Sequence, residues 1–331
     1  MNLRLDILMS KDTVLILADP AEPQLALLKT ELSGCRMVIG NTLEALEHAA
    51  PEASVLFNWS GSLSLFRQVF GISSRLRWVH SRSVGLERTL FPELSESAVV
   101  LTNGSGVFSA SLGEFVAGAI LFFAKDFRRM IRNQRAGVWE AFDVLPVAGR
   151  TVGIVGYGDI GRAIAARVQP LGMKVLAVRR HAGAAGAADP LVDEVYAPEH
   201  RIEMISRSDY VVVAAPLTRE TRGMVGAPEF LAMKATAVVI NVGRGPVIDE
   251  QALIGALSAS RVRGAALDVF DQEPLPAGHP FYSLENVLLS PHCADHTADW
   301  LDNAMKFFIE QYARFEKGDP LLNAVDKKLG Y

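Results

Sequence analysis

The sequence has few cysteines, no long hydrophobic run and no large excess of charge of either sign. Only Cys35 and Cys293 occur, far apart and without a metal-ligand neighbour pattern, so we expect neither a disulfide framework nor a zinc site, and a reducing compartment is the default. No segment approaches the ~18–20 uninterrupted apolar residues of a membrane span. The formal net charge of −4 gives no reason to expect a nucleic-acid or membrane partner.

The first residues also lack the sustained apolar region of a signal peptide, because Arg4 and Asp6 interrupt it. We therefore expect a cytoplasmic protein. What the sequence has in abundance is hydrophobic residues, which make up 50% of its 331 positions. That is enough apolar material for a large core, and the length suggests two domains.

The stretch TVGIVGYGDIG, residues 151–161, organises the rest of the chain. It begins with a short, β-branched apolar run typical of a buried parallel strand, continues with the pattern G-x-G-x-x-G and leads into a helical pattern. In that context Gly156 permits the tight turn, Gly158 lets the backbone approach a pyrophosphate, and Gly161 lets helix pack on strand. The helix N-terminus would then hold the phosphates. A tight strand-to-helix turn without a ligand is the alternative.

Two arginines end the second strand of this series. NAD-binding Rossmann units usually carry an acidic residue there, which bonds the ribose 2′-hydroxyl. This sequence has Arg179 and Arg180, the first of them 18 residues beyond Gly161. Two guanidinium groups attract a 2′-phosphate and can bond it bidentately, whereas a carboxylate would repel it. The pair predicts a preference for NADP(H), with NAD(H) also possible; two solvated surface arginines are the alternative. The alanine- and glycine-rich stretch 182–189 that follows is typical of a flexible loop.

Short apolar runs alternate with helical patterns along the chain, which predicts parallel sheets with helices on both faces. The strands expected in the first third are residues 13–19, 35–40, 53–59, 76–81 and 98–103. After the strand that opens at residue 151, the second series continues with residues 174–180, 194–198, 210–217, 237–243, 262–269 and 286–292. A last long helix is expected near residues 298–317.

A different pattern separates the two series. From Ser111 onwards the sequence predicts one long helix, with Ser109 or Ser111 as its N-cap. Residues 115–124 are almost continuously apolar, so this helix is buried either in the internal core or against a second subunit. Both interpretations stay open at this point.

Arg244, Glu273 and His292 follow strands of the second series, where ligands of open α/β sheets bind. Hydride transfer to a 2-oxo acid needs a cation for the carboxylate, a proton donor for the carbonyl oxygen and a partner that tunes the donor. Arginine, histidine and glutamate fit these roles in that order. Taken singly, each has an ordinary interpretation as a surface arginine, a loop charge or a buried, hydrogen-bonded histidine.

Together these motifs resemble the D-isomer-specific 2-hydroxyacid dehydrogenase family, and within it the NADP-dependent glyoxylate/hydroxypyruvate reductases. The resemblance covers nearly the whole chain and rests on residues 76–87, 103–115, 151–161, 215–225, 240–249, 265–276 and 288–295. It implies an α/β protein with two doubly wound parallel-sheet domains. A Rossmann dinucleotide-binding domain, residues 106–295, would be inserted into a flavodoxin-like substrate domain, residues 1–105 and 296–331.

The resemblance also implies roles for the matching residues. Arg244 would hold the substrate carboxylate and polarise the 2-oxo group. His292 would be the general acid in reduction, with Glu273 fixing its orientation and favouring its protonated form near neutrality. Val84 and Gly85 would bind the carboxylate through backbone N–H groups.

Trp59 would wall the same substrate pocket. The residues expected to line the cofactor are Gly156, Gly158, Asp159, Ile160, Gly161, Arg179, Arg180, Ala215, Pro216, Val242, Gly243, Arg244, Asp268, His292, Ala294 and Asp295.

The activity implied is NAD(P)H-dependent reduction of a small 2-oxo acid, of the glyoxylate or hydroxypyruvate type, to a D-2-hydroxy acid. Hydride would come from C4 of the nicotinamide and the proton from His292, without a metal. A homodimer through the cofactor domain is the expected assembly. Two alternatives remain: a nucleotide-sensing interaction protein like the C-terminal-binding-protein corepressors, whose members keep the same triad, or a relative acting on a different acid.

Overall fold

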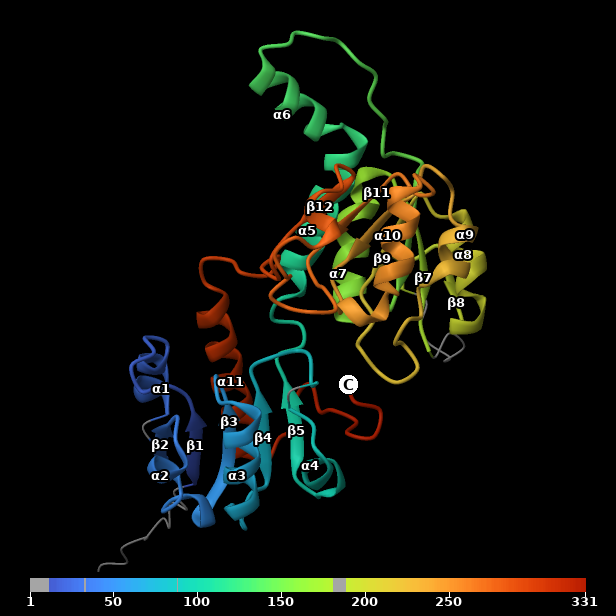
Figure 1. Cartoon of the computed structure of the whole chain (residues 1–331). Coiled ribbons are helices and arrows are strands. Elements are labelled where there is room, and N and C mark those ends of the chain that lie inside the picture. Colours follow the sequence, from blue (N-terminus) through green and yellow to red (C-terminus); the bar gives the residue numbers. More distant parts are fainter. Residues whose placement is uncertain (1–11, 33, 88, 181–188) are drawn as a thin grey trace, which may run out of the picture. The chain divides into compact units, whose positions relative to one another are not determined.

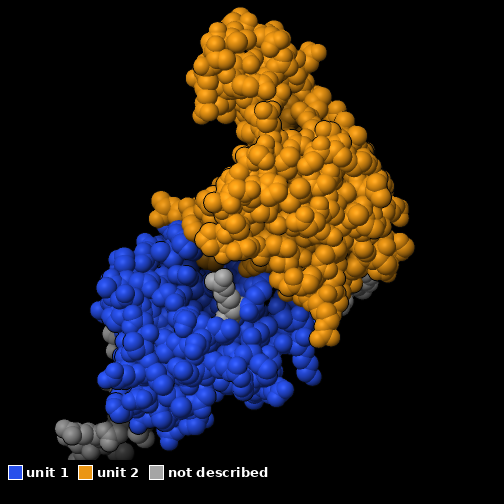
Figure 2. All heavy atoms as spheres, in the orientation of Figure 1, with its two compact units in different colours: residues 1–107, 299–331 blue, residues 108–298 orange. Residues whose placement is uncertain are grey.

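The structure is a computed structural model, which describes residues 12–32, 34–87, 89–180 and 189–331. Most of the alanine- and glycine-rich stretch expected as a loop, residues 182–188, lies outside these ranges. The chain divides into two compact units (Figures 1 and 2). Unit 1 comprises Met1–Val107 with Asp299–Tyr331, and unit 2 comprises Phe108–Ala298.

Unit 1 is built on a five-stranded parallel sheet. Its strands are β1 (Thr13–Leu17), β2 (Arg36–Gly40), β3 (Ala53–Asn58), β4 (Trp78–Ser81) and β5 (Val100–Asn103). They lie in the order β2-β1-β3-β4-β5, the flavodoxin-like order of doubly wound sheets. The helices of this unit are α1 (Leu25–Glu31), α2 (Leu43–Leu46), α3 (Leu63–Ile72), α4 (Pro92–Glu96) and α11 (Trp300–Lys317), with the short 3-10 helix η1 (Ala50–Glu52).

Helix α11 returns to unit 1 because its apolar face completes that unit's core. Phe308 is fully buried and stacks on Phe57 of β3, with ring centroids 3.9 Å apart, and on Trp78 of β4, at 5.4 Å. Gln311, also fully buried, exchanges hydrogen bonds with the backbone of Leu322. The packing explains why the chain's last segment belongs with its first hundred residues.

Unit 2 is built on a seven-stranded parallel sheet. Its strands are β6 (Thr151–Val155), β7 (Lys174–Val178), β8 (Glu194–Tyr196), β9 (Tyr210–Val213), β10 (Val238–Asn241), β11 (Gly264–Leu267) and β12 (Val287–Leu289). Their order is β12-β11-β10-β9-β6-β7-β8. The first six strands in chain order therefore have the Rossmann arrangement, with the order reversing at β6. The expected strands of both series are confirmed, and so is the fold class.

Helices cover both faces of this sheet (Figure 1). The helices on the sheet are α5 (Ser109–Ala124), α7 (Asp159–Val168), α8 (Arg201–Arg207), α9 (Ala227–Ala232) and α10 (Glu250–Ser258), whereas α6 (Phe127–Ala136) extends away from it. The described residues of the unit also form the 3-10 helices η2 (Gln169–Leu171), η3 (Pro198–His200), η4 (Gly245–Val247) and η5 (Pro280–Tyr282). No helix within the described residues is long and apolar enough to cross a membrane.

The expectation of one long helix from Ser111, capped by Ser109 or Ser111, was wrong. The helix breaks at Asp126, whose backbone is left-handed (φ 51°) and whose carboxylate accepts the Arg129 N–H as the N-cap of α6. Ser109 lies inside α5 and is buried, and Phe108 is the N-cap residue. The Ser111 hydroxyl instead donates to the Ala294 carbonyl at 2.7 Å.

The apolar half of α5 lies in the internal core. Val116 and Ile120 are fully buried, and they pack in one cluster with Ile154 of β6 and Ile164 of α7. Gly113 allows close approach to α7, because a Cβ there would lie 2.8 Å from the Ala163 carbonyl oxygen. Of the two interpretations left open for this segment, the internal core accounts for its buried face.

Candidate active site

Three neighbouring strands of unit 2 deliver the three candidate catalytic residues to one sheet edge. Arg244 follows β10, Glu273 follows β11 and His292 follows β12, and these strands are adjacent in the order β12-β11-β10. Because all three strands are parallel, their carboxyl ends meet at the same edge, where open α/β sheets bind ligands.

The structure brings Glu273 and His292 into direct contact. A Glu273 carboxylate oxygen, Oε2, lies 2.7 Å from His292 Nδ1, and the other, Oε1, accepts the Phe270 N–H at 2.9 Å. Both carboxylate oxygens are thus engaged, which fixes the orientation of the imidazole. With Nδ1 bonded to Glu273, Nε2 is the ring nitrogen left to face a substrate. Both side chains keep partial exposure, 42% for His292 and 33% for Glu273.

The buried carboxylate of Asp268 holds the turn that carries His292. Asp268, only 2% exposed, accepts three hydrogen bonds on one oxygen, from Ser290 Oγ (2.6 Å), the Cys293 N–H (3.0 Å) and the Ala294 N–H (3.1 Å). His292 itself has a left-handed backbone, φ 52°, which non-glycine residues adopt at a cost. The resemblance indicated only a cofactor-lining role for Asp268 and did not indicate Ser290. No local pattern could have shown that both hold this turn.

Arg244 is half-buried between two tightly packed glycines. A Cβ at Gly243 would lie 2.7 Å from the Ala215 carbonyl oxygen, and one at Gly245 would lie 2.0 Å from the Phe270 carbonyl carbon. The Asn241 amide donates to the Arg244 carbonyl at 3.1 Å and accepts from the Gly243 N–H at the same distance. These contacts fix the backbone of Arg244, so its guanidinium group starts from a defined position at the sheet edge.

The glycine motif forms the turn from β6 into α7, as its pattern indicates. Gly156 has φ 97°, and a Cβ there would lie 2.5 Å from the Ala215 nitrogen. A Cβ at Gly161 would lie 2.6 Å from the Gly156 carbonyl oxygen. Gly158, by contrast, has open space around its Cβ position, which leaves room for a phosphate group beside the first turn of α7. Asp159 and Ile160 are the first two residues of that helix.

Arg179 and Arg180 lie just past β7, next to β8. Arg179 Nε is buried and has no hydrogen-bond partner within the described part of the chain. Arg180 lies 4.0 Å from Glu220 across an exposed ion pair. A buried, unpaired guanidinium donor is costly unless a ligand accepts from it, so this residue fits a 2′-phosphate.

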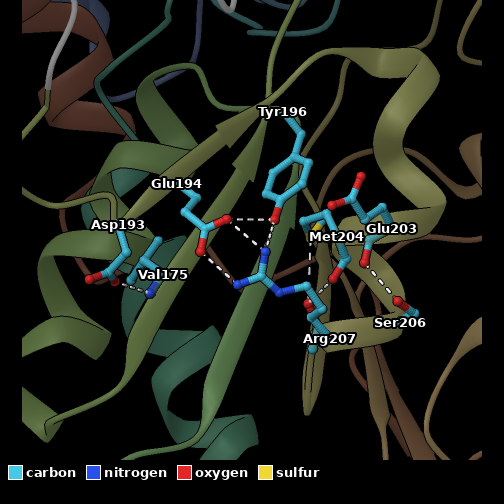
Figure 3. Close-up of polar contacts among 9 residues, drawn as sticks. Val175, Asp193, Glu194, Tyr196, Glu203, Met204, Ser206 and Arg207 are labelled. Atoms are coloured by element: carbon cyan, nitrogen blue, oxygen red, sulfur yellow. Dashed lines mark hydrogen bonds and ion pairs between the residues drawn. The ribbon is translucent and has the colours of Figure 1, made fainter.

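The backbone of Arg179 is hydrogen-bonded to β8. Its N–H donates to the Tyr196 carbonyl at 3.1 Å. Arg207 of α8 donates two hydrogen bonds of 2.6 Å to the Glu194 carboxylate of β8 and one to the Tyr196 hydroxyl of the same strand (Figure 3). The exposed ion pair adds little to stability, but its geometry joins α8 to this strand beside Arg179.

Comparison with known proteins decides the family. A family profile described as "D-isomer specific 2-hydroxyacid dehydrogenase, NAD binding domain" matches residues 117–294, more than half of the chain. The chain belongs to the D-isomer specific 2-hydroxyacid dehydrogenase family. A glyoxylate reductase from Korarchaeum cryptofilum is 32% identical to this family member over 274 residues, which cover 79% of this chain and 80% of that protein.

Solved structures agree with this assignment. A D-isomer specific 2-hydroxyacid dehydrogenase from Xanthobacter autotrophicus, solved with NADPH and MES, is 29% identical with a TM-score of 0.83, and the match covers 97% of this chain and 100% of that one. An NADPH-dependent glyoxylate/hydroxypyruvate reductase from Sinorhizobium meliloti, solved with NADP and sulfate, is 25% identical with a TM-score of 0.80 and the same coverage. These findings confirm the resemblance drawn from the sequence.

The other cofactor-lining residues expected for this dehydrogenase lie at the same sheet edge. Ala215 and Val242 are buried, and Pro216 is exposed, with its carbonyl accepting the Thr221 hydroxyl at 2.6 Å. Burial raises the pKa of Asp295, and Ala294 packs partly against the core. Among the described residues, no group of three or more histidine, cysteine and acidic side chains could hold a metal.

The expected substrate residues of this dehydrogenase lie in unit 1. The N–H groups of Val84 and Gly85 have no acceptor among the residues that the structure describes, while the Val84 carbonyl accepts from the Asn103 amide at 2.8 Å. Trp59 is only 2% exposed, and its indole N–H donates to the Glu22 carboxylate. The indole N–H is therefore already used, so Trp59 shapes its surroundings through its ring.

Proposed function

We propose that this dehydrogenase reduces a small 2-oxo acid, of the glyoxylate or hydroxypyruvate type, to a D-2-hydroxy acid with NADPH. The observation that carries the proposal is the Glu273–His292 pair at the carboxyl edge of a Rossmann sheet, next to Arg244. Unit 2 (expected as residues 106–295) would bind the cofactor, and unit 1 (expected as residues 1–105 and 296–331) the substrate. Both cysteines are free thiols, which fits a reducing location such as the cytoplasm.

In the proposed reaction, Arg244, His292 and Glu273 each have a separate role. When bound, the nicotinamide supplies the hydride from its C4 to the substrate's carbonyl carbon. Arg244 holds the carboxylate and polarises the carbonyl group. His292 Nε2 gives its proton to the carbonyl oxygen as the new C–H bond forms, so the product is the neutral hydroxyl and a neutral imidazole. Glu273 stabilises the imidazolium before that transfer through the 2.7 Å contact with Nδ1.

A steady-state screen of glyoxylate, hydroxypyruvate, pyruvate and phenylpyruvate with NADPH tests the activity. His292→Ala should lower kcat by about 10²–10⁴-fold and leave NADPH binding nearly unchanged, because it removes only the proton donor. His200→Ala, an exposed histidine of the same unit, is the control. If no 2-oxo acid is reduced while NADPH binds tightly, the proposal is wrong and the nucleotide-sensing alternative gains support. Retained turnover in His292→Ala would remove its acid role.

The preference for NADP(H) over NAD(H) rests on Arg179 and Arg180. The unpaired Arg179 Nε supports it, because a 2′-phosphate would supply the missing acceptor. Arg179→Leu with Arg180→Leu should raise the KM for NADPH by about 100-fold and leave that for NADH nearly unchanged, the loss of two charge-assisted contacts. Arg219→Leu, an exposed arginine past β9, is the control. Equal effects on both cofactors, or an unmodified enzyme that prefers NADH, would refute this preference.

We also propose a homodimer through unit 2, formed by α6 and the residues that follow it. Helix α6 has no buried residue and extends from the body of its unit (Figure 1). Its exposed apolar side chains, with those of the next segment, are Phe127, Met130, Ile131, Val138, Trp139, Val144 and Leu145. Each of these side chains is at least 38% exposed in the single chain, and an exposed apolar patch of this kind marks an interaction site.

Size-exclusion chromatography with light scattering tests the assembly. The unmodified chain should have twice the mass of one chain, 35.9 kDa. Ile131→Asp with Trp139→Ser should give the single mass, whereas Leu231→Ser, which removes another exposed apolar residue on α9, should not. A monomeric unmodified chain would refute the proposal.

A further inference from the structure

The carboxyl edge of the unit 1 sheet carries an arginine that the activity proposed above does not use. Arg82 directly follows β4, and its N–H donates to the carbonyl of Asn58, the last residue of β3, at 3.2 Å. Its guanidinium carbon lies 4.8 Å from the ring centroid of Trp59 and 5.6 Å from that of Trp300. Two indole rings, from the end of β3 and the start of α11, thus hold this cation at the edge where doubly wound sheets bind ligands.

The guanidinium N–H groups of Arg82 have no hydrogen-bond acceptor in the part of the chain that the structure describes. The Glu22 carboxylate acts on Arg82 through its charge, but its two oxygens are engaged by the Trp59 indole N–H and by Ser60 Oγ, the latter at 2.5 Å. Burial lowers the pKa of Arg82, although the Glu22 charge opposes that shift, so the cation is partly desolvated.

A guanidinium group that is stacked, partly desolvated and without an acceptor is prepared to bind an anion. Aromatic stacking restricts its rotation, so little conformational entropy is lost when a ligand binds. Its planar pairs of N–H groups match the two oxygens of a carboxylate. By comparison, Arg77 at the other end of β4 also lies over a ring, Phe315, but it already has an ion pair with Asp12 at 2.8 Å.

We propose that Arg82, held between Trp59 and Trp300, binds a second carboxylate at the far end of the substrate and makes short 2-oxo dicarboxylic acids the preferred substrate class. The proposal rests on the proposed 2-oxo acid reduction, and it places diacids ahead of glyoxylate and hydroxypyruvate as substrates of that reaction. Val84 and Gly85, expected to bind the first carboxylate, lie two and three residues further along the chain. The Cα atoms of Arg82 and Val84 are therefore at most about 7 Å apart, so both carboxylate-binding groups belong to one short segment, which favours a short diacid over a long one.

The test compares kcat/KM with NADPH for oxaloacetate and 2-oxoglutarate against pyruvate and glyoxylate, which have no second carboxylate. The unmodified enzyme should prefer a diacid to pyruvate by at least tenfold. Arg82→Leu should lower kcat/KM for that diacid by about 100-fold, the loss of one charge-assisted pair, and change pyruvate by less than about threefold. Arg82→Lys should fall between, because lysine keeps the charge but not the planar fork.

Arg77→Leu is the matched control, since it removes an arginine–aromatic contact at the opposite end of the same strand. It should leave all four substrates unchanged, and urea unfolding should show that every variant is folded. If Arg82→Leu lowers diacid and pyruvate reduction equally, Arg82 binds the first carboxylate and the proposal is overturned. No diacid preference in the unmodified enzyme overturns it as well.

A binding measurement separates this proposal from the proposed reaction. Trp59 and Trp300 report on the site by fluorescence, and the protein saturated with NADPH can be titrated with D-malate and with D-lactate. We expect D-malate to bind at least tenfold more tightly than D-lactate, and Arg82→Leu to abolish the difference. If no 2-oxo acid is reduced but this difference is found, only the reaction has failed. Equal affinities for the two acids overturn the assignment of Arg82 whatever the turnover shows.

Discussion

His80 makes unit 1 sensitive to acid, and the size of the effect follows from its surroundings. The residue lies on β4, is 1% exposed and is surrounded by Phe57, Trp78 and Phe308. Its Nδ1 lies 2.7 Å from Thr102 Oγ1, which also accepts the Trp78 indole N–H at 2.8 Å. The hydroxyl hydrogen of Thr102 is thus available to His80, which accepts it as a neutral imidazole.

Burial lowers the pKa of His80 from 6.5 to about 3. In the unfolded chain the imidazole has its ordinary pKa, so below pH 6.5 the unfolded state binds more protons than the folded state, and stability falls as the pH falls. Between pH 7 and pH 4.5 this single group should remove about 2.5 kcal/mol of the free energy of unfolding. The loss levels off once the pH drops below the folded-state pKa.

His80→Gln removes the titration and keeps an acceptor for Thr102. Urea unfolding at pH 7 and pH 4.5 gives the free energy of unfolding of each variant. Three of the four tryptophans, Trp59, Trp78 and Trp300, lie in unit 1, so fluorescence in a Trp139→Phe background reports on that unit alone. Between pH 7 and pH 4.5, the free energy of unfolding of the protein with His80 should fall by about 2.5 kcal/mol more than that of the His80→Gln variant.

His48→Gln, an exposed histidine of the same unit, is the control and should behave like the parent protein. Carboxylates contribute equally to all three proteins, so they cancel in the comparison. The same pH dependence in His80→Gln and the parent would refute the reasoning, because it would mean that His80 is protonated in the folded state.

Two further predictions concern the unit 2 site. Gly156→Ala should lower the free energy of unfolding by about 1–3 kcal/mol or more, because the Gly156 backbone is left-handed and the new Cβ would meet the Ala215 backbone. Gly158 has open space around its Cβ position, so Gly158→Ala should leave the melting temperature unchanged. The same variant should weaken NADPH binding in a fluorescence titration. Equal melting temperatures for the two variants would contradict the assigned roles. Asp268→Ala should lower kcat at least tenfold and cost about 1–3 kcal/mol, because it leaves the donors of the His292 turn unpaired. Asp271→Ala, which replaces an exposed acidic residue nearby, is the control. An unaltered kcat in Asp268→Ala would show that the His292 turn keeps its conformation without the Asp268 hydrogen bonds.

The strands could be predicted from the sequence because each is a short apolar run that is buried on both faces. Thr13–Leu17, for example, is buried at every position, which requires the continuous apolar pattern seen in the sequence. The break between α5 and α6 could not be predicted in this way. Lys125 and Asp126 are compatible with a helix interior, and only the left-handed backbone of Asp126 separates the two helices.

The candidate site likewise contains residues that the sequence identifies and contacts that it does not. Residues that directly follow strands, such as Arg244 and His292, were identifiable because parallel strands deliver their ends to one edge. Contacts between distant segments were not. The hydrogen bonds from the His292 turn to Asp268 join residues more than 20 positions apart. The contact of Arg82 with the Trp300 ring joins the first and last parts of the chain. Neither pairing leaves a local spacing pattern.

The return of α11 to unit 1 also orders the events of biosynthesis. Phe308 completes the core around Phe57, a contact that spans 308 − 57 = 251 positions of the chain. Unit 2 lies wholly between these residues and is synthesised before α11, so it can fold while unit 1 still lacks its last helix. Until Phe308 arrives, Phe57 and Trp78 lack the ring that covers them. The nascent chain therefore exposes this part of the unit 1 core from the completion of β4 until α11 has been synthesised.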